Sequence, residues 1–339
     1  MEKKPTLKDI ASICGCSVTT VSRALQKSPT ISEATQKKIA DIAKELGYIP
    51  NSLAMSMRTG YTNTIAACIQ DFRNPFFSAM AKYIESCARK FGYFALFSTT
   101  NESPDQEYHV CETLLQKNVD GILLFPIQQD TSAVELLVRQ NIPFVLVGRY
   151  FDELDTDYVL TDDAQGAYLV TRHLIDRGAQ RILFLNVSST ISSARCRRSG
   201  YLRALDESGY TPHILEGSMV YGKTREILYS IRDELPQYDA IMTFCDIMGF
   251  EAYNALAKMG YRIPEDIMLA SLDGLPLFNI DLRDLLGIGN VDRLYFIQVY
   301  RAIGFRLAAP VLVHREIRDG VNIDLLAAAV FYQKQDQHQ

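Results

Sequence analysis

The sequence predicts an α/β protein in which a small helical head precedes two lobes built on parallel sheets. Two observations lead to this prediction. From Thr64 onward, short apolar runs alternate with helical stretches, which is typical of buried parallel strands joined by helices. Before that point, apolar residues recur at helical spacing in three short segments. The length of 339 residues is enough for two or three compact units.

The head, residues 6–46, is predicted to form three helices. Gly15 interrupts the apolar pattern between the first two, as a tight turn requires. Two short helices around a glycine turn, backed by a third, make a helix-turn-helix. Each helix opens on a hydroxyl side chain suited to N-capping: Thr6 before LKDIASIC, Ser17 before VTTVSRAL, and Ser32 before the segment that ends at Gly47.

Residues 50–62 are predicted to be a linker. Pro50 and Gly60 bracket a segment with few large apolar side chains, so it cannot pack a core of its own. We expect it to form about two helical turns when something stabilises it.

Seven strands are predicted over the roughly 270 residues after the linker, which suits two adjacent α/β lobes better than one sheet. The runs are TIAACI, YFALF, GILLFP, FVLVG, RILFLN, AIMTF and IMLASLD.

Bulk composition excludes several classes of protein. With 47% apolar and 22% charged residues, the chain is globular rather than disordered or fibrous. The N-terminus lacks the apolar stretch of a signal peptide, and no run approaches the roughly 18 apolar residues of a membrane span. The seven cysteines are odd in number and scattered, and Cys14 and Cys16 lack zinc-site spacing. We therefore expect a cytoplasmic protein with free thiols, no membrane association and no metal.

The distribution of charge favours a nucleic-acid partner although the net charge is −5. Residues 1–62 carry nine Lys and Arg against five Asp and Glu. The remainder of the chain is acidic. A basic head on an acidic body is expected of a DNA-contacting module carried by a sensor.

The head contains the segments TLKDIASICGCSVTTVSRAL and ISEATQKKIADIAKELGYIPN. These segments closely resemble the DNA-binding head of the LacI/GalR family of transcriptional regulators. The resemblance continues through 54–60 and DFRNPFF at 71–77, and then in order through VDGILLF, VGR, TDDAQGA, RRSGYLRAL and IPEDIMLASLDG, which ends at Gly274.

The resemblance implies a helix-turn-helix domain (1–49), a hinge helix (50–62) and a two-lobed effector-binding and dimerisation domain (63–335) like that of periplasmic sugar-binding proteins. The first lobe would span about 63–161 plus part of 290–320. The second would span about 162–289 plus the C-terminal segment.

The second predicted helix supplies the candidate DNA-reading residues. Val18, Thr19 and Arg23 lie away from its apolar stripe, and the N-terminal part of such a helix reaches base edges in the major groove. Arg23 can grip a guanine bidentately. Short hydroxyl side chains suit phosphate oxygens, with helix capping as the alternative interpretation: Thr6, Ser17, Thr20 and Ser22.

In the linker, the resemblance implies a hinge helix that orders in the minor groove. Tyr48, Asn51 and Ala54 match the family pattern. Met57 stands where the family places a leucine wedge, and methionine can serve as one. Met55 replaces a common arginine, which removes one phosphate contact. If the hinge is not used, both methionines are interface residues only.

Effector-binding candidates lie where predicted strands end, because ligands bind at the carboxyl ends of parallel strands. Carboxylates and a guanidinium can bridge the hydroxyls of a polyol, and aromatic faces can cover its C–H surface. A sugar or similar polar metabolite is favoured. Salt bridges, caps and, for Phe77, simple core packing are the alternatives. The candidates are Asp71, Asn74, Phe76, Phe77, Arg197, Asp246 and Asp273.

Three departures from the family pattern stand out. Cys245 replaces an asparagine, and Gly148 stands where Asp is common. After Gly274 the pattern is not recognisable. The closing residues hold no leucine heptads, which favours a dimer without a tetramerising tail.

The sequence therefore predicts a homodimeric repressor that binds a palindromic operator under the control of a small metabolite. A corepressor-dependent or ligand-unresponsive regulator is the alternative. A transport solute-binding protein would lack the basic head. No nucleophile with an adjacent base, no dinucleotide loop and no cofactor motif is present, so an enzyme is not expected.

Overall fold

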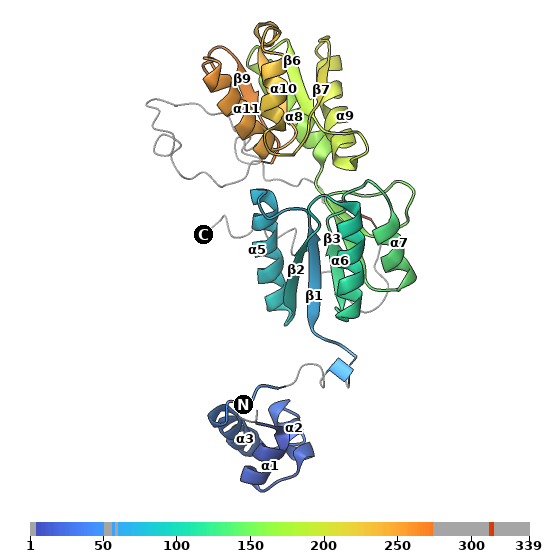
Figure 1. Ribbon diagram of the computed structural model, residues 1–339, viewed down its shortest axis with the longest axis vertical. Coiled ribbons are helices and arrows are strands. Elements are labelled where there is room, and N and C mark those ends of the chain that lie inside the picture. Colours follow the sequence, from blue (N-terminus) through green and yellow to red (C-terminus); the bar gives the residue numbers. More distant parts are fainter. Residues whose placement is uncertain (1–4, 51–55, 58–59, 274–311, 315–339) are drawn as a thin grey trace. The chain divides into compact units, whose positions relative to one another are not determined.

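The computed structural model describes residues 5–50, 56–57, 60–273 and 312–314. The chain divides into two compact units, Met1–Thr62 and Asn63–Gln339 (Figure 1). The second unit contains two separate sheets with helices on their faces. The predicted α/β class, with its helical head, is confirmed.

The head consists of three helices around one small core. They are α1 (Leu7–Cys14), α2 (Val18–Leu25) and α3 (Glu33–Glu45). Gly15 adopts a left-handed conformation with φ of 67° at the end of α1, which an L side chain adopts only under strain. The apolar residues of all three helices meet in one buried cluster: Ile10, Ala11, Val21, Ala24, Ile39 and Ala43.

The first lobe is a six-stranded sheet in the order β10-β5-β4-β3-β1-β2. All neighbouring strands are parallel except β10, which runs antiparallel to β5. The elements are β1 (Thr64–Ile69), α5 (Pro75–Lys90), β2 (Phe94–Thr99), α6 (Pro104–Gln116), β3 (Gly121–Leu124), α7 (Ser132–Arg139), β4 (Phe144–Val147), β5 (Tyr158–Leu160) and β10 (Leu312–His314).

The second lobe is a four-stranded parallel sheet in the order β7-β6-β8-β9. Its elements are α8 (Asp163–Asp176), β6 (Ile182–Asn186), α9 (Ser192–Asp206), β7 (His213–Glu216), α10 (Lys223–Ser230), the 3₁₀ turn η1 (Leu235–Gln237), β8 (Ala240–Thr243), α11 (Asp246–Lys258) and β9 (Met268–Ala270).

Three strands were not among the seven predicted. β5 and β10 are only three residues long, and β7 is an edge strand whose residues are half-buried or exposed. Short strands, and edge strands with one side exposed to solvent, lack a long apolar run. Such a run was the signal that predicted the other seven strands.

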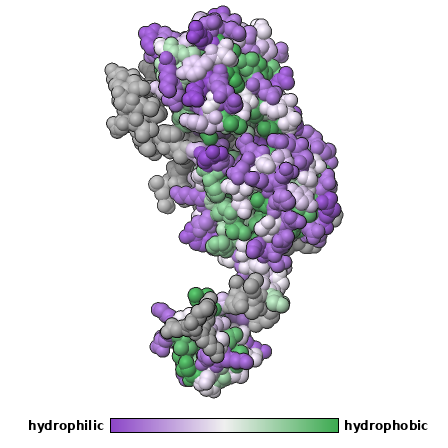
Figure 2. All heavy atoms as spheres, viewed as in Figure 1, coloured by the Kyte–Doolittle hydropathy of each residue, from purple (hydrophilic) through white to green (hydrophobic). Residues whose placement is uncertain are grey.

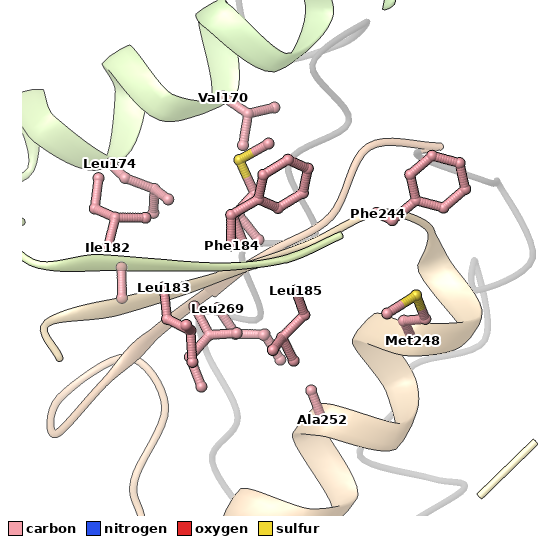
Figure 3. Close-up of a cluster of buried hydrophobic side chains, with 14 of the residues drawn as sticks. Val170, Leu174, Ile182, Leu183, Phe184, Leu185, Phe244, Met248, Ala252 and Leu269 are labelled. Atoms are coloured by element: carbon pink, nitrogen blue, oxygen red, sulfur yellow. The ribbon is translucent and has the colours of Figure 1, made fainter. Parts of the chain in front are cut away.

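The core of the second lobe explains why its strands are apolar on both faces. Figure 3 shows Ile182 and Phe184 directed toward Val170 and Leu174 of α8, while Leu183 and Leu185 point to the opposite face, where Met248 and Ala252 of α11 lie. All four β6 side chains are fully buried. A sheet covered by helices on both faces has this property.

Helices α8 and α9 approach each other closely at Gly200. A Cβ added to Gly200 would lie 1.9 Å from the carbonyl oxygen of Ala164 on α8, a separation that side chains do not adopt. The next residue, Tyr201, packs its ring 5.3 Å from that of Phe184 and donates a hydrogen bond of 2.7 Å to the carbonyl of Ile182. Close backbone contact and a buried tyrosine together fix α9 on the sheet.

Apolar side chains also remain exposed along one edge of the first lobe. Figure 2 shows apolar residues gathered on the side of α5 and β2. Phe94 is 68% exposed on edge strand β2, Phe91 is exposed just before this strand, and the exposed ring of Phe72 lies 6.3 Å from that of Phe97 on β2. An aromatic edge of this kind is suited to pairing with another protein surface.

Candidate functional site

The outward face of α2 carries the residues predicted to read DNA. Val18, Thr19 and Arg23 are exposed, whereas Val21 and Ala24 on the opposite side are buried in the head core. Because the buried side is fixed by packing, the three exposed side chains project from one rigid face. A short rigid helix of this kind fits the major groove.

The hydroxyl residues of the head serve first as helix caps. Thr6 forms a capping box with Asp9, in which its Oγ1 donates a hydrogen bond of 2.7 Å to Asp9 Oδ2 and accepts one from the Asp9 amide. Ser17 caps α2 by accepting from the amide of Thr20, and the two hydroxyls lie 2.8 Å apart. Thr6 and Ser17 are therefore helix caps, and the Thr20 hydroxyl pairs with the cap of α2, while phosphate contacts of all three stay a prediction.

The remaining head and linker candidates fall in different environments. Tyr48 packs, half-buried, against the head core, and Ser22 accepts a weak hydrogen bond from Gln26. Met57 is helical and 90% exposed, as a residue free to insert into a groove would be. Asn51 and Ala54 lie outside the described residues.

Four predicted effector residues follow β1 in the first lobe. Asp71 accepts hydrogen bonds from the amide and side chain of Arg73, which lower the pKa of its carboxyl group. Asn74 caps α5 through the amide of Phe76. Phe77 is buried in the lobe core, where its ring contacts those of Phe76 and Phe125 edge-on. Each residue thus has a local structural role, and ligand contacts of the four remain predictions.

The three predicted residues of the second lobe do come together. Arg197 on α9 lies with one Nη 3.5 Å from Asp273, just after β9. The amide of Asp246, at the start of α11, donates to Asp273 Oδ2 at 3.3 Å. All three side chains are nearly buried. The carboxyl ends of β8 and β9, the second turn of α9 and the start of α11 therefore meet at one point.

Two further residues complete this group, which we call the Arg197 cluster: Asp163, Arg197, Asp246, Ser271 and Asp273. Asp163 accepts a hydrogen bond of 2.8 Å from Arg197 Nε, and Ser271 donates its hydroxyl to Asp246. Sequence reasoning quoted Asp163 within TDDAQGA and Ser271 within IPEDIMLASLDG without assigning either to the site. Asp163 is the first residue of α8, directly after the N-cap Asp162. An acidic residue is common at a helix start, so the sequence alone did not single out Asp163 as a site residue.

Three carboxyl groups and one guanidinium share the Arg197 cluster. Burial by itself would lower the pKa of Arg197, but Asp163 and Asp273 outweigh it and the pKa is raised. Burial raises the pKa of Asp273 to about 6, although Arg197 acts in the opposite direction. Arg197 also stacks over the ring of Phe244, 4.3 Å from its centroid, and donates to the Phe244 carbonyl. A guanidinium so held presents a fixed donor edge, which suits recognition of hydroxyl-bearing ligands.

A second buried polar group lies in the first lobe, at the carboxyl ends of β1, β3 and β4. Arg149 donates to the carbonyls of Pro126 and Ile127 at 2.9 and 3.1 Å and to Gln70 Oε1 at 3.3 Å. Glu107 on α6 accepts from the amide of Ile127 at 2.9 Å. Sequence reasoning noted VGR but did not foresee that its arginine is buried. These bonds fix the segment after β3.

Glu107 gives the fold a testable pH dependence. Burial raises the pKa of its carboxyl group from 4.5 to about 7. Between these values the unfolded chain ionises while the folded protein retains the proton, so the free energy of unfolding falls as pH rises, by about 3 kcal/mol in total. In denaturant titrations at pH 5 and pH 8, Glu107→Gln should remove this loss.

The control for this prediction is Glu85→Gln on α5, where the side chain is half-exposed and its partner, Arg89, is charged at both pH values. The difference in the free energy of unfolding between pH 5 and pH 8 should be the same in this variant as in the parent protein. Equal pH dependence in Glu107→Gln and the parent would contradict the assignment.

Two family models match the chain. Residues 6–51 match that of bacterial regulatory proteins of the lacI family, and residues 62–301 match that of periplasmic binding proteins and the sugar binding domain of the LacI family. Among the helices of the described ranges, none is both long and apolar enough to cross a membrane.

Individual relatives agree with these matches. The chain is 30% identical to the ribose operon repressor of Halalkalibacterium halodurans over 275 residues, which cover 81% of this chain and 82% of that one. It is also 30% identical to the HTH-type transcriptional repressor PurR of Aliivibrio salmonicida over 278 residues, covering 80% and 83%. In fold it is similar to the Lac repressor dimer bound to operator and the anti-inducer ONPF, with a TM-score of 0.71 at 24% identity, covering 79% and 82%.

Proposed function

Since this chain belongs to the LacI family of bacterial regulatory proteins, we propose that it is a homodimeric repressor of transcription whose affinity for a near-palindromic operator is set by a small metabolite. The resemblance found in the sequence, and with it the function of a DNA-binding transcriptional regulator, is confirmed. The proposal adds the residues, the dimer and the ligand class.

The observation that supports DNA reading best is the exposed face of α2, with Arg23 on a helix whose other face is buried. We assign base contacts to Val18, Thr19 and Arg23. We assign phosphate contacts to Thr6, Ser17 and Thr20 at the capped N-termini of α1 and α2, and to Ser22 in the middle of α2. Tyr48, Asn51, Ala54 and Met57 are assigned to the hinge.

Two copies are needed because one head offers too little surface for tight specific binding. The Lac repressor in the similar structure is a dimer on its operator. In this chain the exposed aromatic edge along β2 supports contact with a second copy. We keep 1–49 as the DNA-binding domain, 50–62 as the hinge and 63–335 as the effector and dimerisation domain.

The metabolite is assigned to the Arg197 cluster together with Asp71, Asn74, Phe76 and Phe77. Buried carboxylates beside a guanidinium favour a ligand rich in hydroxyl groups, which agrees with a sugar. The similar ribose operon repressor is named for a sugar operon. We infer a binding role without catalysis, because the similar ribose operon repressor and PurR are repressors of transcription, and we infer action in the cytoplasm, where bacterial DNA lies.

The test begins with the purified dimer and a pool of random DNA duplexes. Selection should enrich a near-palindromic sequence, and its affinity should fall steeply with salt, by a log–log slope of about −0.9 for each phosphate contacted. A thermal-shift screen of pentoses, hexoses, disaccharides and nucleobases should then reveal a stabilising compound. At a ligand concentration of about 100 times the dissociation constant, binding adds about 2.7 kcal/mol to the free energy of unfolding. Failure to enrich any sequence, with or without that compound, would refute the proposal.

A further inference from the structure

Helix α9, which carries Arg197, begins without a cap of its own. Its N-cap residue is Ile191, whose side chain cannot accept a hydrogen bond. The amide of Ser192 instead donates to Gln128 Oε1 at 2.9 Å, and the Ser192 hydroxyl donates to the same oxygen at 3.1 Å. Gln128 follows β3 and belongs to the first lobe, so the helix is capped from the opposite lobe.

The contact is closed by a third residue. Gln128 Nε2 donates to the carbonyl of Tyr150 at 2.5 Å, and the Tyr150 amide donates to Ser192 Oγ at 3.1 Å. Gln128 and Ser192 are 7% and 1% exposed, so these bonds are shielded from water. We call this ring of Gln128, Tyr150 and Ser192 the clasp.

The first-lobe side of the clasp is rigid. Arg149 holds the carbonyls of Pro126 and Ile127, and Glu107 holds the amide of Ile127, directly before Gln128. A buried arginine and a buried carboxyl group therefore fix the backbone that presents the Gln128 side chain. Any movement of one lobe against the other must break bonds at the clasp rather than bend this segment.

The second-lobe side leads directly to the Arg197 cluster. Arg197 lies on the helix that begins at Ser192, and α9 is locked to the sheet through Gly200 and Tyr201. Between Ser192 and Arg197 on this helix, Arg195 pairs with Asp152 at 2.5 Å. This ion pair is partly exposed and therefore adds little to the stability of the contact. The start of α9 therefore connects the contact between the two lobes with the Arg197 cluster.

We propose that Gln128 is a positioning residue: by capping α9 across the lobe junction, it holds Arg197 in its place and stabilises the clasped arrangement of the two lobes. This inference rests on the proposed function for its biological meaning, since the Arg197 cluster is the assigned effector site. Separation of the lobes exchanges the clasp bonds for bonds to water and releases the first turn of α9.

Cys196 provides a reporter that requires neither DNA nor effector. It lies beside Arg197 on α9, is half-buried, and is in hydrogen-bond contact with Tyr150 of the clasp. Burial raises the pKa of its thiol, so opening of the junction both exposes the sulfur and restores its ionisation. Its rate of alkylation by iodoacetamide, followed at each cysteine by mass spectrometry on the full chain, therefore measures opening.

Gln128→Ala should raise the alkylation rate of Cys196 about tenfold, and Ser192→Ala, which keeps the capped amide, about threefold. Cys14 and Cys16 in the head should react at parent rates in both. The matched control is Ser103→Ala, which removes the N-cap of α6 inside the first lobe. It should leave Cys196 within twofold of the parent while lowering the melting temperature comparably.

Amide exchange separates positioning from simple destabilisation. In Gln128→Ala, exchange should accelerate in residues 192–198 but not in 104–110, and in Ser103→Ala the reverse. A parent-like Cys196 rate in a folded Gln128→Ala protein, or an equal rise in Ser103→Ala, would overturn the inference. If Cys196 responds as expected but no DNA sequence is enriched, the clasp stands and the proposed function fails.

Discussion

Replacement of Arg23 with alanine is expected to abolish preference for the selected operator while leaving weak, sequence-independent DNA binding. A bidentate arginine–guanine contact contributes about 1–3 kcal/mol of discrimination. Two heads double this, so the ratio of specific to scrambled affinity should fall by about 30-fold or more. Competition between the selected duplex and a scrambled duplex at fixed salt measures the ratio.

Two variants control for charge. Arg23→Lys keeps the positive charge but not the planar fork, so it should lose preference while retaining the salt dependence of the parent. Lys37→Ala removes one charge from an exposed position on α3 and should keep the preference. Operator preference that survives in a folded Arg23→Ala protein would contradict the assignment, and the metabolite identified by thermal shift should still stabilise this variant.

Gly200→Ala is expected to have the largest effect on stability. The new methyl group would lie 1.9 Å from the Ala164 carbonyl oxygen, so α8 and α9 must separate. Overpacking of this kind costs about 1–3 kcal/mol and more where backbone must move, and we expect at least the upper value. The midpoint of urea unfolding of the effector half should fall accordingly.

Gly166→Ala on α8 is the matched control. A Cβ there meets no atom within 4 Å, and the glycine is helical with ordinary φ. Alanine should therefore be neutral or stabilise by up to about 1 kcal/mol through helix propensity. If both variants unfold at the same urea concentration, the close approach of the two helices is not as described.

Local sequence signals were sufficient for most of the fold. The hydroxyl caps Thr6, Ser17 and Ser32 and the left-handed Gly15 are determined by neighbours a few residues away, so the start of each head helix and the end of the first two could be predicted to the residue. β7 could not, because an edge strand keeps one side wet and lacks a continuous apolar run.

The candidate site could be predicted only in part, because local patterns do not encode contacts between residues far apart in the sequence. Arg197, Asp246 and Asp273 were found because they match a family pattern, and the structure brings them together. The bond between Gln128 and Ser192 joins positions 64 residues apart. No local pattern encodes such a pairing, and neither does the burial of Arg149, since arginine is ordinarily exposed.

The antiparallel pairing of β10 with β5 bears on how the protein is synthesised. In the described part of the chain, the elements of the second lobe follow one another from α8 to β9, so this stretch leaves the ribosome in one piece and can begin to fold there. The first sheet cannot be completed until residues 312–314 have been made, so β5 stays an uncovered edge while the intervening chain is translated. Nascent chains that stall in this interval are therefore the ones we expect chaperones to retain.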